Sequence, residues 1–257
     1  MTRRRRSVAF ADSPDAKVVA PPERASSFHR VFVKICGVTS EEDGLLAVGM
    51  GADAIGLNFV PGSKRQIAVD RARDIVRRLP PETMTVGIFR NELPERVVEI
   101  VQRAGLRAAQ LHGDESAEDA RRVRSRIPVV IKAFAAGHPA LSRVADFGAD
   151  AIMIDGAEPG SGEVFDWSLA EGAPSAGYRV LLAGGLHPGN VADAIARVRP
   201  WGVDVATGVE SAPSRKDPVK LREFIANARA AGAQLPDDAS SVKIDDAPYN
   251  WEEDFLS

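Results

Sequence analysis

The chain contains a single cysteine, Cys36, which follows Lys34 by two residues. Residues 31–35 are rich in strand-forming side chains, and Gly37 breaks the run where a loop would begin. Because side chains alternate along a strand, Lys34 and Cys36 share one face and Ile35 lies on the other. A lysine beside a thiol is costly to build into a core. Free cysteines are nevertheless often small buried hydrophobic residues, so this stretch leaves the role of the thiol open.

Asp155 is a carboxylate that ends the apolar run of residues 151–154. Partial burial would favour its protonated form and let it act as a general acid, whereas an aspartate that caps the next turn is a common structural alternative. Glycines recur further along in Ala183-Gly184-Gly185 and in Ala206-Thr207-Gly208. Glycines there let backbone N–H groups approach an anion, although they are also ordinary turn residues. We expect one phosphate site, since no comparable glycine run follows the third or fourth predicted strand.

Two further side chains stand at predicted strand ends. Arg65 follows the Gly-containing segment 61–64, where it is either a surface charge or a mobile clamp for a carboxylate or phosphate. His112 follows Gln110 and Leu111, and its type fits either a binding role or a hydrogen-bonded structural histidine.

The elements that must hold these side chains follow a strict alternation. Short apolar runs predict eight strands, over residues 31–36, 53–59, 84–89, 107–111, 128–134, 150–155, 179–184 and 202–206. Their nearly continuous apolar sequence is typical of parallel strands that are covered on both faces.

Helical periodicity fills the intervals between the strands. It is clear over residues 69–79, 94–104, 115–125, 188–198 and 217–231, and weaker over 139–147 and 166–171. Thr39-Ser40-Glu41-Glu42 has the residue types of a helix start. Eight βα units predict a single α/β domain with the (β/α)8 TIM-barrel fold, with its active site at the C-terminal ends of the strands. A doubly wound sheet is the alternative, but it would want a Gly-rich turn after its first strand.

The composition is that of an ordinary protein of one large or two small domains, with 257 residues of which 44% are hydrophobic and 27% charged. One cysteine excludes an internal disulfide and a Cys-rich zinc site, and it is compatible with a reducing cytoplasm. No apolar run approaches the roughly 20 residues that span a bilayer. The basic N-terminus also lacks the apolar stretch of a secretory signal. We therefore expect a cytoplasmic protein that does not bind membranes.

The two ends of the chain differ from its middle. Residues 1–30 carry a net charge of +4, from seven basic and three acidic residues, and residues 233–257 carry −6, from one lysine and seven acidic residues. Neither end has a helical or strand period, so we expect a disordered basic extension, a barrel over residues 31–232 and a disordered acidic tail. An apolar group in the tail could dock on a surface: Tyr249, Trp251, Phe255 and Leu256. The nearly neutral middle gives no electrostatic case for nucleic-acid binding.

Together, the strand-end motifs resemble phosphoribosylanthranilate isomerase. The resemblance runs from about Val31 to Ala231 and rests on Lys34-Ile35-Cys36-Gly37-Val38-Thr39, Gly87-Ile88-Phe89, Gln110-Leu111-His112-Gly113, Asp155-Gly156, Gly160-Ser161-Gly162, Phe165-Asp166-Trp167, Ala183-Gly184-Gly185-Leu186, Val203-Asp204-Val205, Gly208-Val209-Glu210 and Lys216-Asp217. It implies an aldose–ketose isomerase of tryptophan biosynthesis that needs no cofactor or metal. Such an enzyme converts N-(5-phosphoribosyl)anthranilate to 1-(2-carboxyphenylamino)-1-deoxyribulose 5-phosphate, and the expected assembly is a monomer or homodimer.

The resemblance also implies roles for single residues. Cys36 would be the general base and Asp155 the general acid, with Lys34 as a candidate for lowering the pKa of the thiol. Arg65 would face the anthranilate carboxylate. The remaining substrate contacts would come from His112, Gly184, Gly185, Thr207 and Gly208, the glycine loops holding the phosphate.

The chain departs from the usual family pattern at three places. Lys64 stands where proline is usual, Pro159 replaces a glycine, and Ala206-Thr207 stands where two serines are common, which removes one hydroxyl from the phosphate loop. Two alternatives remain at this point. One is a related sugar-phosphate isomerase or epimerase, such as the histidine-pathway aminoaldose isomerase, which typically relies on two aspartates and takes a substrate with two phosphates. The other is a catalytically inactive barrel that serves as a binding module.

Overall fold

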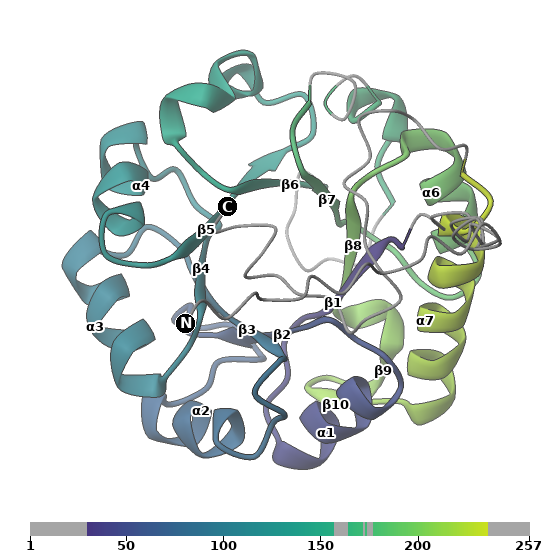
Figure 1. The fold of residues 1–257 in the computed structure, drawn as a ribbon, viewed down its shortest axis with the longest axis horizontal. Coiled ribbons are helices and arrows are strands. Elements are labelled where there is room, and N and C mark those ends of the chain that lie inside the picture. Colours follow the sequence, from purple (N-terminus) through teal and green to yellow (C-terminus); the bar gives the residue numbers. More distant parts are fainter. Residues whose placement is uncertain (1–29, 157–163, 172, 174–176, 236–257) are drawn as a thin grey trace, which may run out of the picture.

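The computed structural model describes residues 30–156, 164–171, 173 and 177–235, and these residues form a closed barrel of eight parallel strands (Figure 1). The strands are β1 (Phe32–Ile35), β2 (Ala54–Asn58), β3 (Met84–Phe89), β4 (Ala108–Leu111), β5 (Val129–Ala135), β6 (Ala151–Asp155), β7 (Val180–Leu182) and β8 (Gly202–Val205). Each strand pairs with the next one along the chain, and β8 pairs with β1 to close the ring. The predicted fold class and all eight predicted strands are confirmed.

Helices surround the barrel on the outside, as Figure 1 shows. The α-helices are α1 (Glu41–Gly49), α2 (Val69–Val76), α3 (Pro94–Ala104), α4 (Ala117–Arg124), α6 (Val191–Val198) and α7 (Pro218–Gly232). The described residues also form short 3-10 segments: η1 (Pro139–Phe147), η2 (Trp167–Leu169) and η3 (Thr207–Val209). A small antiparallel hairpin, β9 (Glu210–Ala212) with β10 (Arg215–Lys216), follows β8 and was not predicted.

The helices differ from the prediction mainly at their ends. The helix expected from residue 188 begins at Val191, because Pro188 lies in the turn before it. The helix expected over residues 69–79 ends at Val76, shortly before Pro80 and Pro81, which cannot continue it. The two weakly periodic segments are 3-10 structure, and η1 is kinked at Arg143, where φ is −130°.

Two apolar layers follow from the alternation of side chains along the strands. The side chains on one face of the strands fill the interior of the barrel, with residues such as Phe32, Met84, Ile131, Met153 and Leu181. The other face packs against the helices in a larger cluster. Lys34 points inward, whereas Val33 and Ile35 belong to the outer cluster, as the alternation predicts.

A buried carboxylate, Asp53, ties the N-terminal end of the barrel together. It lies just before β2, accepts a hydrogen bond from the backbone N–H of Val33 at 2.8 Å, and pairs with Arg30 at 2.8 Å and Arg229 at 2.7 Å. Its side chain is 2% exposed. This cluster lies at the end of the strands opposite to Cys36 and Asp155.

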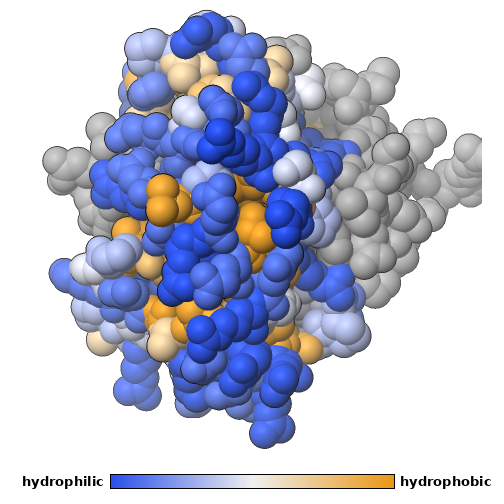
Figure 2. Space-filling view, turned by 90° about the vertical axis from the view of Figure 1, so that its left-hand side faces the viewer, coloured by the Kyte–Doolittle hydropathy of each residue, from blue (hydrophilic) through white to orange (hydrophobic). Residues whose placement is uncertain are grey.

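The outer face that includes α3 and α4 is mainly hydrophilic, with hydrophobic side chains in small separate patches (Figure 2). Among the described residues, no helix is both long and apolar enough to cross a membrane. Most of the N-terminal extension, the segment with Pro159 and Gly160-Ser161-Gly162, and the tail from residue 236 with its aromatic group lie outside the described residues.

Candidate active site

Cys36 lies directly after β1, where the strand opens into the barrel mouth. Its backbone N–H donates to the carbonyl of Val205 on β8 at 2.8 Å. Gly56 of β2 makes room for the thiol, since a Cβ atom added to Gly56 would lie 3.0 Å from Sγ of Cys36. The residue as a whole is partly exposed, although strands surround the thiol.

Below the thiol, Lys34 and Asp204 form a buried ion pair across the closing seam of the barrel. The two residues are register partners on β1 and β8, and Nζ lies 2.7 Å from Oδ1. The Lys34 side chain is fully buried. Burial lowers its pKa, but the charges of Asp204 and Cys36 outweigh this effect and raise the pKa overall. Lys34 is therefore an ammonium held beside the thiol.

The pKa of the Cys36 thiol is nevertheless raised. Burial is the largest cause, and the charge of Asp204 adds to it, whereas Lys34 and Lys216 act in the opposite direction. Lys34 thus acts in the predicted direction and lowers the thiol pKa. Desolvation is the larger effect, so the pKa is raised overall.

These opposing effects on the thiol pKa predict how the reactivity of Cys36 depends on pH. Alkylation by iodoacetamide reports on Cys36 alone, because the chain has one cysteine and the thiolate is the reacting form. The apparent pKa from the rate profile of the folded protein should exceed that of the urea-unfolded chain. Asp204→Asn should lower the apparent pKa, and Lys34→Gln should raise it further. A folded-state value below the unfolded one would contradict this account.

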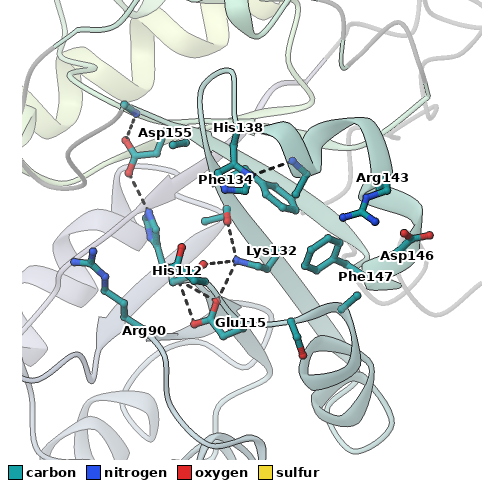
Figure 3. A pocket seen from close by; sticks show the side chains of 18 residues that line it. Arg90, His112, Glu115, Lys132, Phe134, His138, Arg143, Asp146, Phe147 and Asp155 are labelled. Carbon is teal, nitrogen blue, oxygen red and sulfur yellow. Dashed lines mark hydrogen bonds and ion pairs between the residues drawn. The ribbon is translucent and has the colours of Figure 1, made fainter.

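Asp155 and His112 meet on the neighbouring part of the mouth (Figure 3). Nε2 of His112 lies 3.2 Å from Oδ2 of Asp155, while Oδ1 of Asp155 accepts the backbone N–H of Gly156 at 2.7 Å. Although Nε2 and Oδ2 are close, the angle between the two groups does not meet the geometry of a hydrogen bond. Nδ1 of His112 lies 2.9 Å from Nε2 of Gln110. Both side chains also line a cavity of about 470 Å³ on the β4–β6 side.

Arg65 lies close over Gly37, on the other side of the thiol. A Cβ atom at Gly37 would lie 2.2 Å from Cδ of Arg65, and φ of Gly37 is +73°, so glycine is needed there. The guanidinium donates from Nε and Nη2 to Glu210, at 2.7 and 2.8 Å, and from Nη2 to Thr207 at 2.9 Å. Arg65 is therefore held in place rather than free as a mobile clamp.

Glu210 also binds Lys216, which makes it the centre of a small charged network. Nζ of Lys216 lies 3.2 Å from Oε1 of Glu210 and donates to the carbonyls of Cys36 at 2.7 Å and Ala206 at 3.2 Å. Burial opposes ionisation of Glu210, but Arg65 and Lys216 outweigh it and lower the pKa of Glu210. The network joins the loops after β1, β2 and β8.

The predicted phosphate loops after β7 and β8 are in direct contact. A Cβ atom at Gly208 would lie 2.0 Å from the carbonyl oxygen of Leu186, and one at Gly184 would lie 3.1 Å from Oδ1 of Asp155. Gly184 and Gly185 have φ values of +82° and +65°. The backbone N–H groups of Gly184, Gly185 and Gly208 donate to no other part of the chain that the structure describes. They are available to an anion beside Asp155.

The strand order brings all the predicted site residues to one end of the barrel. His112 follows β4. Going round from β6 to β2, the strand ends carry Asp155, then Gly184 and Gly185, then Thr207 and Gly208, then Cys36, then Arg65. Barrels of this fold carry their active sites at this end, and frequently a phosphate site in the loops after β7 and β8.

The comparison with protein families matches residues 33–227 to the model of N-(5'-phosphoribosyl)anthranilate isomerase. The chain belongs to this family. It is a phosphoribosylanthranilate isomerase, an intramolecular oxidoreductase of tryptophan biosynthesis. The family match decides against the two alternatives that the sequence motifs left open.

Individual relatives agree with the family match. The isomerase of Desulforudis audaxviator is 49% identical over 207 residues, covering 78% of this chain and 98% of that protein. The crystal structure of the isomerase from Thermus thermophilus is 44% identical, with a TM-score of 0.74 over 78% of this chain and 99% of that one. A further isomerase structure, in complex with reduced 1-(o-carboxyphenylamino)-1-deoxyribulose 5-phosphate, is 41% identical, with a TM-score of 0.71 and the same coverage.

Sequence reasoning about this isomerase did not assign the charged residues that support the site. Asp204 and Glu210 were noted only as parts of motifs, and Lys132 was not singled out. The position of Asp204 could have been predicted, because the alternation of side chains along β8 places it inside the barrel beside Lys34. No comparable signal shows that Glu210 binds Arg65, since these residues are 145 positions apart.

Proposed function

We propose that Cys36 and Asp155 are the general base and general acid of the isomerisation. Asp155 would protonate the furanose ring oxygen, so that the C1–O bond breaks and the ring opens to an iminium ion. The Cys36 thiolate would then remove the proton from C2 to give an enolamine. Tautomerisation of the enolamine gives the amino-ketose product, so the reaction is an internal redox change that needs no external oxidant.

One observation carries this assignment. Cys36 and Asp155 both face inward at strand ends, on either side of the glycine loops of β7 and β8. A sugar phosphate held by those loops would present its ring to both groups. Steady-state kinetics of Cys36→Ala and Asp155→Asn, with phosphoribosylanthranilate as substrate and its fluorescence loss as the signal, tests the assignment.

The phosphate is proposed to bind the backbone N–H groups of Gly184, Gly185 and Gly208. Two observations support this site: these groups have no acceptor among the described residues, and the two loops are in contact. The ligand named for the related structure carries one 5-phosphate, which agrees with a single glycine-rich anion site. Thr207 is exposed and already accepts a hydrogen bond from Arg65, so it links the phosphate loop to the arginine.

Arg65 is proposed to bind the anthranilate carboxylate through Nη1. The other guanidinium nitrogens are occupied by Glu210 and Thr207, whereas Nη1 donates to no residue that the structure describes. A guanidinium held on one edge presents a fixed donor to a carboxylate.

Arg65→Ala should raise KM for phosphoribosylanthranilate by about 10-fold or more, because a hydrogen bond to a charged group contributes roughly 1.5–3 kcal/mol. KM for the aniline analogue that lacks the carboxylate should change far less. Both constants come from the same steady-state assay. If the wild type binds the two substrates equally well, the assignment of Arg65 is wrong.

His112 is proposed to align Asp155 rather than to react itself. The 3.2 Å approach of Nε2 to the carboxylate supports this role. Catalytic hydrogen bonds are often poorly aligned in the free enzyme and tighten when substrate binds.

The catalytic domain is proposed to be residues 31–232, with both terminal segments dispensable for the chemistry. The described barrel ends with α7 at Gly232, close to the proposed boundary. A chain of residues 30–235, which keeps the Arg30–Asp53 ion pair and the packed Leu235 side chain, should retain the kcat and melting temperature of the full chain, both measured side by side. A lower melting temperature with unchanged kcat would indicate docking of the tail, and lost activity would refute the boundary.

A further inference from the structure

A buried lysine, Lys132, lies beneath the loop that carries His112 (Figure 3). It is on the outer side of β5, its side chain is 2% exposed, and its ammonium lies over the rings of Phe134 and Phe147 at 5.1 and 6.0 Å. Nζ contacts four oxygen atoms: Gly113 O at 2.7 Å, Ala133 O at 2.9 Å, Glu115 Oε2 at 3.0 Å and Leu111 O at 3.4 Å. Two of these carbonyls belong to the residues on either side of His112.

Glu115 completes the arrangement from the other direction. Its side chain is 3% exposed, and its carboxylate accepts the backbone N–H of Asn91 at 2.9 Å and that of Gly113 at 2.9 Å. One buried carboxylate therefore joins the loop after β3 to the loop after β4. The backbone N–H of His112 donates to Phe89 at 2.8 Å, which fixes the remaining side of the peptide.

The backbone of His112 is thus fixed on both sides by one buried ion pair. Its imidazole points from that fixed point to Asp155, at 3.2 Å. We propose that Lys132 and Glu115 are positioning residues for the reaction, which set the place of His112 and through it the orientation of Asp155. This inference rests on the proposed role of Asp155 as the acid.

Burial of this ion pair is poorly explained by stability alone. Taking two charges out of water costs several kcal/mol per ion, and apolar residues of similar volume are often neutral or stabilising replacements. The pair lines the same cavity as His112 and Asp155, but its polar contacts are with backbone groups of the loops and of β5 rather than with Asp155. What it supplies is a fixed geometry for the loop, and misplacement of a catalytic group by about 1 Å can cost 10²-fold in rate.

Glu115→Gln tests the proposal with little change in shape. We expect kcat to fall by roughly 10-fold or more, because loss of one backbone clamp lets His112 shift. KM should stay within about 2-fold, since the proposed phosphate and carboxylate contacts are on β7, β8 and the loop after β2. If Glu115→Gln does not fold, the charge-neutral pair Lys132→Met with Glu115→Gln is measured instead.

A double-mutant cycle separates positioning from general destabilisation. In a His112→Ala background, Glu115→Gln should cause little further loss of kcat, because the side chain through which it acts is absent. Its effect on melting temperature should persist in both backgrounds. Asp53→Asn is the matched control: it breaks a buried ion-pair cluster at the far end of the barrel, and should lower the melting temperature while leaving kcat unchanged.

The outcomes are distinguishable. An unchanged kcat for Glu115→Gln, or a loss that adds fully to that of His112→Ala, would overturn the positioning role. If Asp155→Asn nevertheless loses activity, the proposed role of Asp155 as the general acid still stands, and only the positioning role is refuted. If Asp155→Asn keeps near-native kcat, the proposed function itself fails, and the positioning role fails with it.

Discussion

Cys36→Ala and Asp155→Asn should each lower kcat by at least about 10²-fold, the low end for loss of a general acid or base. KM should change much less, because the proposed phosphate and carboxylate contacts lie on Gly184, Gly185, Gly208 and Arg65. The loss for Cys36→Ala should grow as pH rises, since more of the wild-type thiol is then thiolate, whereas alanine cannot accept a proton at any pH. The measurement is the initial rate of fluorescence loss from phosphoribosylanthranilate.

Folding must be shown to be intact in both variants. Cys36 lies against Gly56 and replacement by alanine removes one sulfur atom, so we expect the melting temperature to change little. Near-native kcat in Cys36→Ala would show that the thiol is structural and that another group removes the C2 proton. Near-native kcat in Asp155→Asn would show that the ring oxygen receives its proton from elsewhere.

Gly208→Ala is expected to disrupt phosphate binding. The added Cβ would lie 2.0 Å from the carbonyl oxygen of Leu186, so the backbone of one glycine loop must move away from the other. Loss of a hydrogen bond to a charged ligand costs about 1.5–3 kcal/mol, which corresponds to a rise in KM of roughly 10- to 100-fold. Competitive inhibition by inorganic phosphate should weaken by a similar factor.

Gly49→Ala is the matched control for this substitution. Gly49 is the last residue of α1, and an added Cβ there meets nothing within 4 Å. It should leave KM and phosphate inhibition unchanged. Equal KM values for Gly208→Ala and the wild type, with phosphate inhibition retained, would place the phosphate outside these loops.

The sequence predicts the strands and the residues at their ends well, but the helix ends only approximately. The period of two along buried strands was enough to place Lys34 inside the barrel and Ile35 outside it, because that geometry is local. The position of Asp155 at a strand end followed from the same pattern. The end of α2 and the late start of α6 depend on nearby prolines, and were placed only approximately.

The electrostatics of the site could not be predicted in the same way. The sign of the shift in the thiol pKa depends on desolvation as well as on charge, and desolvation requires the packed structure. The binding of Arg65 by Glu210 joins residues 145 positions apart, and that of Lys132 by Glu115 joins strand β5 to the loop after β4. Such partners become visible only when the barrel is closed.

The seam between β1 and β8 has a consequence for the order in which the enzyme acquires its activity. Cys36, the proposed base, and Lys34 are made early in synthesis, but the other charged groups around them come much later in the chain: Asp204 is 170 positions after Lys34, and Lys216 is 180 positions after Cys36. Until β8 docks, Lys34 has no counter-charge at this position, and the carbonyl of Cys36 lacks the ammonium that holds it. Closing the ring and completing the reactive centre are therefore one event, so a nascent chain that lacks its last βα unit has neither.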